Sequence, residues 1–130
     1  MRFSILRPEG DDFVMADGDD LFPARGHHPE SRQRFRLPIK GSFAGGALDH
    51  ARVQWSNDLE TDTRFSLHPK ASPDRAYDSI VSVPLWRAGE ITGVLNVIAS
   101  RKNAFSAVDR TYITLLASVI DVAESLRQPL

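Results

Sequence analysis

Hydrophobic and polar positions in the last third of the chain change from a strand pattern to a helix pattern. Two apolar runs, 80–86 and 91–98, flank a short polar turn and predict two antiparallel strands. Because both faces of each run are apolar, these strands are expected at the centre of a sheet that is covered on both sides. Ser106 and Asp109 then have the spacing of a capping box, which predicts a helix with regular periodicity to Leu126.

In the preceding two thirds of the chain, the runs of alternating apolar and polar residues are shorter. They predict a β-hairpin in residues 3–16, a strand in 33–37, a short helix in 47–51 and a strand in 52–55. Residues 66–78 contain two prolines and are expected to form a lid rather than a long helix. These elements predict an α+β fold: a central antiparallel sheet of five to six strands, with the long C-terminal helix on one face and short helices and loops over the other.

The predicted C-terminal helix carries two apolar stripes. We expect the broader one to lie on the sheet; it consists of Val108, Tyr112, Leu115, Leu116, Val119, Ala123 and Leu126. The second stripe is rotated away from it and consists of Ile113, Ala117 and Ile120. It therefore needs a cover from elsewhere, because apolar patches of this kind mark contact surfaces.

Composition is that of one small globular domain spanning residues 1–130. The chain is 42% apolar, and 16 basic against 17 acidic residues give a net charge of −1. This balance offers no long-range attraction to nucleic acid, so no nucleic-acid partner is expected. The sequence contains neither a signal-peptide pattern nor an apolar window long enough to span a membrane, and the expected location is the cytoplasm.

Candidate chemistry is sparse. The absence of cysteine excludes disulfides, thiolate metal sites, thiol redox sensing and thioether attachment of a bilin. The four histidines do not have metal-ligand spacing, so no metal site is expected. No set of nucleophile, base and stabilising group can be assembled from known motifs, and these residues predict that the protein is not an enzyme.

Several segments together resemble the GAF domain family, the α/β sensor modules of phosphodiesterases, phytochromes and bacterial signalling proteins. The resemblance extends over residues 2–127. It implies a domain that binds a small molecule without catalysis and signals through its terminal helix. The segments that carry it are Val53-Gln54-Trp55-Ser56-Asn57-Asp58 with Asp62-x-Arg64-Phe65, Ser79-Ile80-Val81-Ser82-Val83-Pro84-Leu85, Gly93-Val94-Leu95, and the junction from Phe105 to Asp109.

The resemblance also implies a pocket between the central strands and the lid. Its expected lining is Trp55, Phe65, Tyr77, Ser79, Val81 and Val83, with Arg64 and Asp58 as polar groups. The ligand is not identified. Cyclic nucleotides are not expected, because Ala99 and Ser100 stand where binding members have Asn-Lys and Arg110 replaces a Glu. Members of the family that reduce methionine sulfoxide use cysteines, and this chain has no cysteine. The alternative is a collapsed pocket in a dimerisation or scaffolding module.

Typical GAF domains begin with a helix that packs beside the last one, and this chain starts directly at a predicted strand. The resemblance therefore implies a domain truncated at its N-terminal helix, or a piece of a longer signalling protein. Without that helix, the stripe of Ile113, Ala117 and Ile120 would be exposed, and a homodimer through these residues is expected. The alternative is that a loop or the N-terminal residues cover the stripe.

Overall fold

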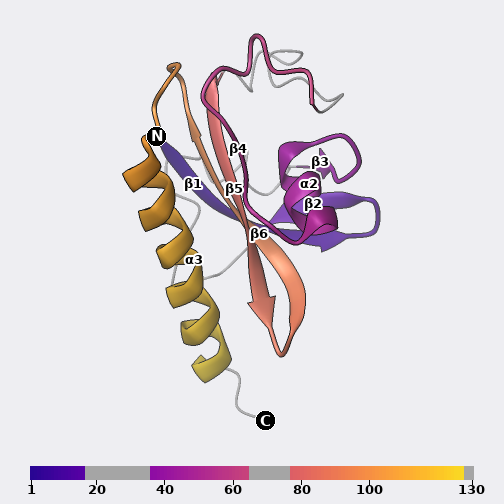
Figure 1. Cartoon of the computed structure of the whole chain (residues 1–130). Coiled ribbons are helices and arrows are strands. Elements are labelled where there is room, and N and C mark those ends of the chain that lie inside the picture. Colours follow the sequence, from indigo (N-terminus) through magenta and orange to yellow (C-terminus); the bar gives the residue numbers. More distant parts are fainter. Residues whose placement is uncertain (17–35, 65–76, 128–130) are drawn as a thin grey trace.

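A computed structural model describes residues 1–16, 36–64 and 77–127 (Figure 1). Six strands form one antiparallel sheet in the order β3-β2-β1-β6-β5-β4, which confirms the α+β class predicted above. The strands are β1 (Arg2–Glu9), β2 (Asp12–Met15), β3 (Leu37–Pro38), β4 (Gln54–Ser56), β5 (Ser79–Arg87) and β6 (Glu90–Ala99). The helices are α2 (Phe43–His50) and α3 (Ala107–Arg127). Most of the predicted lid and of the predicted strand 33–37 lies outside the described residues.

The centre of the sheet brings the two ends of the chain together. Strand β1 pairs with β6 from Arg2 opposite Ile98 to Leu6 opposite Val94. Strands β5 and β6 form the predicted apolar hairpin, which closes at Arg87 opposite Glu90. A β-bulge between Leu85 and Trp86 shifts the pairing of this hairpin by one residue. From Leu85 opposite Gly93 onward, every pair of residues in β5 and β6 is therefore offset by one from the pairs next to the turn.

Helix α3 lies along one face of the sheet, and Figure 1 shows it on the side opposite α2. Its contact residues are Ile113, Ala117 and Ile120, which are only 7%, 2% and 5% exposed. They pack on Val81, Val83 and their neighbours in β6. The orientation predicted for this helix is therefore wrong: these three residues form the internal face, and they are not an exposed dimer surface.

Polar contacts explain this rotation of α3. Asp121 accepts a hydrogen bond from the backbone N–H of Trp86 at 2.9 Å, and Glu124 pairs with Arg7 of β1. Both acids lie on the same side of α3 as the buried stripe, so their partners hold that side against the sheet. Ala117 is small and lets the helix approach closely between two isoleucines.

Helix α2 covers the other face. It begins at Ser42, whose Oγ accepts a hydrogen bond from the N–H of Gly45 at 3.0 Å, so the helix starts four residues before the predicted one. Phe43 belongs to one apolar cluster of this face, with Leu59, Ile80 and Ile98. Ala44 and Ala47 belong to a second cluster, with Leu6, Phe13, Met15, Leu37 and Val94.

The junction from β6 to α3 is fixed by a side-chain clamp. Nδ2 of Asn57 donates to the carbonyl oxygen of Phe105 at 2.7 Å, and Oδ1 of Asn57 accepts from the N–H of Phe105 at 3.1 Å. The predicted capping box follows, with reciprocal bonds of 3.1 and 2.9 Å between Ser106 and Asp109. The hydrogen bond from the Ser106 N–H to the Asp109 carboxylate is the main cause that lowers the pKa of Asp109. The start of α3 is thereby tied to the loop after β4.

Candidate functional site

Four polar side chains cross the α2 face of the sheet in one line. The pairing places Ser4 of β1 opposite Asn96 of β6, Asn96 opposite Ser82 of β5, and Ser82 opposite Gln54 of β4. Directly paired residues point to the same face, so the four side chains are neighbours across four adjacent strands. We call them the polar row. They are 3%, 9%, 0% and 8% exposed in the order Ser4, Asn96, Ser82 and Gln54.

The polar row is poorly satisfied internally. Ser82 Oγ donates to Asn96 Oδ1 at 2.6 Å, and this is the one side-chain hydrogen bond that the row makes within the described part of the chain. Nδ2 of Asn96, the amide of Gln54 and the hydroxyl of Ser4 have no protein partner among those residues. None of these atoms is among the fully buried unpaired polar atoms of the described residues, so they keep contact with solvent, where water or a ligand can satisfy them. The row therefore presents several donors and acceptors to a polar molecule.

The polar row also divides the apolar face of the sheet. On one side lies the cluster with Ile80 and Ile98, and on the other the cluster with Leu6 and Val94. Helix α2 contributes to both clusters, so it spans the row. The helix is made of small residues there, since Ala44 to Ala47 include Gly45 and Gly46. A polar strip between two apolar walls can orient a small amphipathic molecule.

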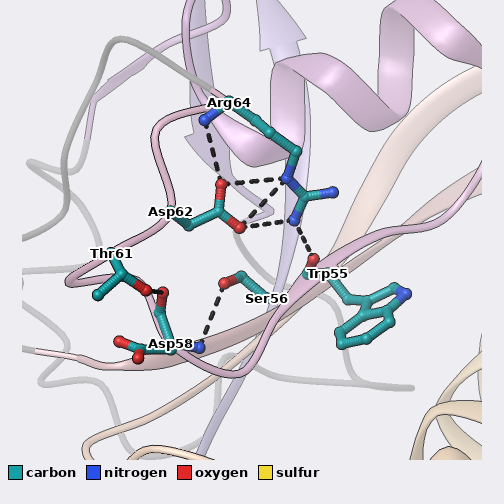
Figure 2. A network of polar contacts seen from close by, with 6 residues as sticks. All are labelled: Trp55, Ser56, Asp58, Thr61, Asp62 and Arg64. Atoms are coloured by element: carbon teal, nitrogen blue, oxygen red, sulfur yellow. Dashed lines mark hydrogen bonds and ion pairs between the residues drawn. The ribbon is translucent and has the colours of Figure 1, made fainter.

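A fixed cation lies beside α2 (Figure 2). Nη2 of Arg64 lies 2.8 Å from Oδ2 of Asp62 and also donates to the backbone carbonyl of Trp55. Its guanidinium lies 5.3 Å from the centre of the Phe43 ring. Mainly through these hydrogen bonds, Arg64 lowers the pKa of Asp62 to about 2. Asp62 thus stays ionised and holds Arg64 at the Phe43 end of α2.

The predicted pocket residues of β4 and β5 lie on the α3 face. Val81 and Val83 are buried against α3, and Ser79 donates to the carbonyl of Arg101 at 2.7 Å. Trp55 is opposite Val81 and has the Arg110 guanidinium 3.8 Å from its ring centre. Figure 2 shows the Trp55 ring pointing away from the Arg64–Asp62 pair. The structure therefore does not bring these four residues to the polar row.

The remaining predicted pocket residues do not lie together: among those that the structure describes, two reach the α2 face and one does not. Tyr77 packs against the cluster of Phe43, Leu59, Ile80 and Ile98, so it and Arg64 are the two that reach the α2 face. Asp58 is partly exposed; its Oδ1 is buried and lies 3.7 Å from Nζ of Lys102. Phe65 lies outside the described residues. Sequence reasoning missed the polar row; its signal was a polar residue flanked by apolar ones inside each apolar run, at Ser82 and Asn96.

A separate cavity of about 490 Å³ lies on the α3 face. Its walls come from β1, the β6–α3 junction and the first turns of α3, including Phe3, Arg101, Phe105, Tyr112 and Leu116. Strands β1 and β6 separate this cavity from the polar row. Its walls combine apolar side chains with the polar residues Ser100, Arg101 and Asp109.

Metal and membrane sites have no support in the described residues. Residues 1–16, 36–64 and 77–127 contain no group of three or more His, Asp or Glu side chains arranged to hold a metal ion. None of the helices within these ranges is long and apolar enough to cross a membrane.

Solved structures with the same fold include both enzymes and regulatory domains. Free methionine-R-sulfoxide reductase from Neisseria meningitidis, solved with its substrate, has a TM-score of 0.71 and 20% identity over 93% of this chain and 65% of that one. The type II enzyme from Thermoplasma acidophilum has a TM-score of 0.71 and 14% identity over 95% and 78%. The GAF domain of an Acinetobacter phosphoenolpyruvate-protein phosphotransferase has a TM-score of 0.70 and 17% identity over 97% and 72%.

These similarities establish a shared fold and correct two expectations. We expected a domain that binds or scaffolds without catalysis, and we expected the chain not to be an enzyme. Both were deduced from the family resemblance and from missing motifs. Since reductases have this same fold, that deduction is wrong, because the fold does not separate binding modules from enzymes.

The sequence comparisons identify the family. A search of curated proteins finds no match. A family model described as GAF domain matches residues 3–123, which is most of the 130-residue chain. This match confirms the resemblance seen in the Pro-Leu and Gly-Val-Leu strands, which became β5 and β6. The chain belongs to the GAF domain family.

Proposed function

We propose that this GAF domain binds a small polar molecule of free-amino-acid size at the polar row. The observation that carries the proposal is the line of Ser4, Asn96, Ser82 and Gln54 across four strands, buried and with most of its hydrogen-bonding groups unused within the described residues. One buried serine among apolar residues would not by itself indicate a binding site. Four polar side chains in direct register, beneath a helix made of small residues, indicate a recognition surface.

The chemistry of the row indicates the class of ligand. The Asn96 and Gln54 amides each provide N–H donors and a carbonyl acceptor, and the two serines provide hydroxyls. Such a set suits a neutral or zwitterionic molecule with carbonyl, carboxylate or sulfoxide oxygens rather than a multiply charged one. The charge of Arg64 at the Phe43 end of α2 is already balanced by ionised Asp62, so the pair adds no net charge to this face. The reductases that share the fold are named for a free amino acid, methionine-R-sulfoxide, which supports the size and polarity proposed here.

Isothermal titration calorimetry with the free amino acids and with methionine-R-sulfoxide tests the proposal. We expect saturable binding of at least one of them, and at least a tenfold loss of affinity in Asn96→Leu, which is about 1.4 kcal/mol. Ser125→Ala is the matched control, because it removes a serine hydroxyl from the exposed side of α3 and should bind normally. No binding by any of these compounds, or equal binding by Asn96→Leu, would contradict the proposal.

Thermal unfolding separates loss of the site from loss of the fold. Replacing Ser82 and Asn96 together by alanine and leucine removes both partners of the buried bond, so stability should be unchanged or raised. A stable double variant without binding supports a ligand site.

Catalysis is tested in parallel, because enzymes share the fold. Methionine-R-sulfoxide is incubated with the protein and dithiothreitol, which supplies two electrons and two protons for each sulfoxide oxygen released as water. Formation of free methionine above the rate without protein would extend the proposal from binding to turnover. Without it, the calorimetric result decides the binding proposal alone.

A further inference from the structure

The cavity of about 490 Å³ on the α3 face has the size and the lining of a small-molecule site. Ala99, Phe105 and Ile113 form its floor, and all three are buried in the core between the sheet and α3. Polar side chains from the β6–α3 junction complete the lining. Pockets for small molecules have volumes of roughly 300 to 1,000 Å³ and combine an apolar lining with a few polar groups. This cavity fits that description on the face opposite the polar row.

Three aromatic side chains from separate elements line the cavity. Phe3 comes from β1, Phe105 from the β6–α3 junction and Tyr112 from the second turn of α3. Figure 1 shows the start of β1 beside the first turns of α3, which brings these segments together. Aromatic rings pack well against other rings in offset or edge-to-face contacts. The apolar part of the cavity therefore favours a flat, aromatic molecule.

Arg101 supplies the cavity with a positive charge that is not used in an ion pair. Its guanidinium makes no hydrogen bond or ion pair with the residues that the structure describes. Asp109 lines the same cavity, but its carboxylate accepts a hydrogen bond from the N–H of Ser106 at 2.9 Å. A guanidinium without a partner can donate two parallel hydrogen bonds to one carboxylate. The polar part of the cavity therefore favours a ligand with a carboxylate.

The two cations of the β6–α3 loop have different surroundings. Nζ of Lys102 lies 2.9 Å from Oε2 of Glu60 and 3.7 Å from Oδ1 of Asp58, so acids of the loop after β4 compensate its charge. Arg101, one residue earlier, lines the cavity instead. Of these two neighbouring cations, only Arg101 can pair with a ligand in the cavity.

Hydrogen bonds fix the backbone of the loop that carries Arg101. Ser79 Oγ donates to the carbonyl oxygen of Arg101 at 2.7 Å and accepts from the N–H of Ala104 at 3.3 Å. The N–H of Asn103 donates to the carbonyl oxygen of Asn57 at 2.8 Å, and the Asn57 side chain clamps the junction that follows. Binding therefore does not have to order this backbone, which lowers the entropic cost of association.

We propose that this cavity binds an aromatic carboxylic acid. The carboxylate pairs with Arg101. The ring packs among the aromatic side chains of Phe3, Phe105 and Tyr112. A monoanion suits the cavity better than a phosphate dianion, because it holds one guanidinium and the carboxylate of Asp109 would repel a second negative charge. This site does not depend on the polar row, which lies on the opposite face of the sheet.

Titration with cinnamate and with cinnamamide, followed in the amide NMR spectrum of the protein, tests the proposal. The two probes have the same flat body, and only cinnamate carries a carboxylate. We expect cinnamate to shift the amides of residues 99–105 and 109–116 with a Kd of about 5 mM or tighter, as a ligand of this size allows. Cinnamamide should bind at least about fivefold more weakly. The absence of saturable shifts, or shifts confined to Gln54 and Ser82 of the polar row, would overturn the proposal.

Two substitutions in the loop separate recognition of the carboxylate from binding of the ring. Arg101→Gln should weaken cinnamate binding at least about fivefold and leave cinnamamide binding unchanged, because only the carboxylate loses its partner. Lys102→Gln is the matched control: it removes the neighbouring charge, which is already compensated by acids, and both probes should bind as in wild type.

A third substitution tests the aromatic wall. Tyr112→Ser removes an exposed ring, so the fold should be kept, and both probes should bind more weakly. Amide signals remote from the cavity report whether each variant keeps the wild-type fold. Equal affinity of wild type for the two probes, or an unchanged Kd for cinnamate in Arg101→Gln or in Tyr112→Ser, would contradict the proposed site.

Discussion

Asn96 shows how one side chain sets the character of a whole sheet face. It lies in the middle of β6, between the buried Leu95 and Val97, and contacts the Ser82 hydroxyl. A leucine at this position would join the two apolar clusters of the α2 face into one continuous core. The amide instead keeps them apart and leaves hydrogen-bonding capacity under α2, at a cost in stability that binding of a polar molecule would offset.

The protonation of Asp62 should change the free energy of unfolding as the pH is lowered. Its pKa is about 2 in the folded protein against an ordinary value of 3.8, so its contribution to stability is complete above pH 3.8 and is lost as the pH falls toward 2. The full shift corresponds to about 2.5 kcal/mol, but Arg64 is 52% exposed and solvent screening reduces this to about 1 kcal/mol. We expect the free energy of unfolding of Asp62→Asn to be about 1 kcal/mol lower than that of wild type near pH 6.

Urea unfolding at several pH values measures this difference. The gap between wild type and Asp62→Asn should narrow between about pH 4 and pH 2, because wild-type Asp62 is then protonated as well. Thr61→Ala, one residue earlier, removes only a 3.5 Å exposed bond and should follow the wild-type curve. A gap that stays constant down to pH 2 would show that the Asp62 charge does not contribute.

At the scale of elements, the loop after β4 governs the start of α3. Asn57 satisfies both backbone groups of Phe105, a residue that is 2% exposed. We expect Asn57→Ala to lower the free energy of unfolding by about 2 kcal/mol, because the Phe105 N–H then has no partner while buried. Hydrogen exchange should also accelerate at the first turn of α3. A loss under about 0.5 kcal/mol, as expected for an exposed polar residue, would rule out the clamp.

Helix α2 depends on the absence of a side chain at Gly45. A Cβ built there would lie 1.6 Å from the backbone oxygen of Ile39, so the chain before the helix would have to move. We expect Gly45→Ala to cost about 3 kcal/mol or more. Gly89→Ala is the control: its φ is +80° and the space around it is open, so the cost should be near 1 kcal/mol. Equal losses in thermal unfolding would contradict this role of Gly45.

Periodicity was sufficient to predict the elements but not their faces. The β5–β6 hairpin and α3 were predicted with nearly correct bounds, because their apolar runs are long. Both faces of β5 are apolar, so alternation could not show that Val81 faces α3 while Ser82 faces α2. A regular hairpin closing at 87 and 90 would place Ser82 opposite Leu95, and the bulge shifts its partner to Asn96. No local pattern in the sequence predicts that bulge.

The error on α3 had a similar origin. Both stripes have helical spacing, and the broader one was assigned to the sheet because it has more apolar residues. What decided the rotation was the position of partners on other strands, Arg7 for Glu124 and the Trp86 N–H for Asp121. Contacts between residues more than thirty positions apart are not visible in a local period. The broader stripe is the exposed one, so the number of apolar residues at helical spacing did not show which side of α3 packs on the sheet.

At the scale of the molecule, one sheet separates two surfaces with different chemistry. Helices α2 and α3 lie on opposite sides of this sheet (Figure 1). The α2 face carries the polar row, and the α3 face carries the apolar core on which α3 packs. Residues that alternate along β5 belong to these two surfaces in turn. A ligand at Ser82 would therefore be separated from α3 by a single strand, while Arg110 and Trp55 connect β4 to the first turns of α3.

The pairing of β1 with β6 also fixes the order in which the molecule can be completed during synthesis. β1 is synthesised before β6, and its partner from Val94 to Ile98 follows some ninety residues later. Until then the β1–β2 hairpin has one open edge, and Ser4 has no neighbour from which to build the polar row. Closing this long separation is slow relative to local contacts, so the nascent chain exposes an unpaired apolar strand throughout its translation. Demand for chaperones should accordingly peak just before β6 emerges.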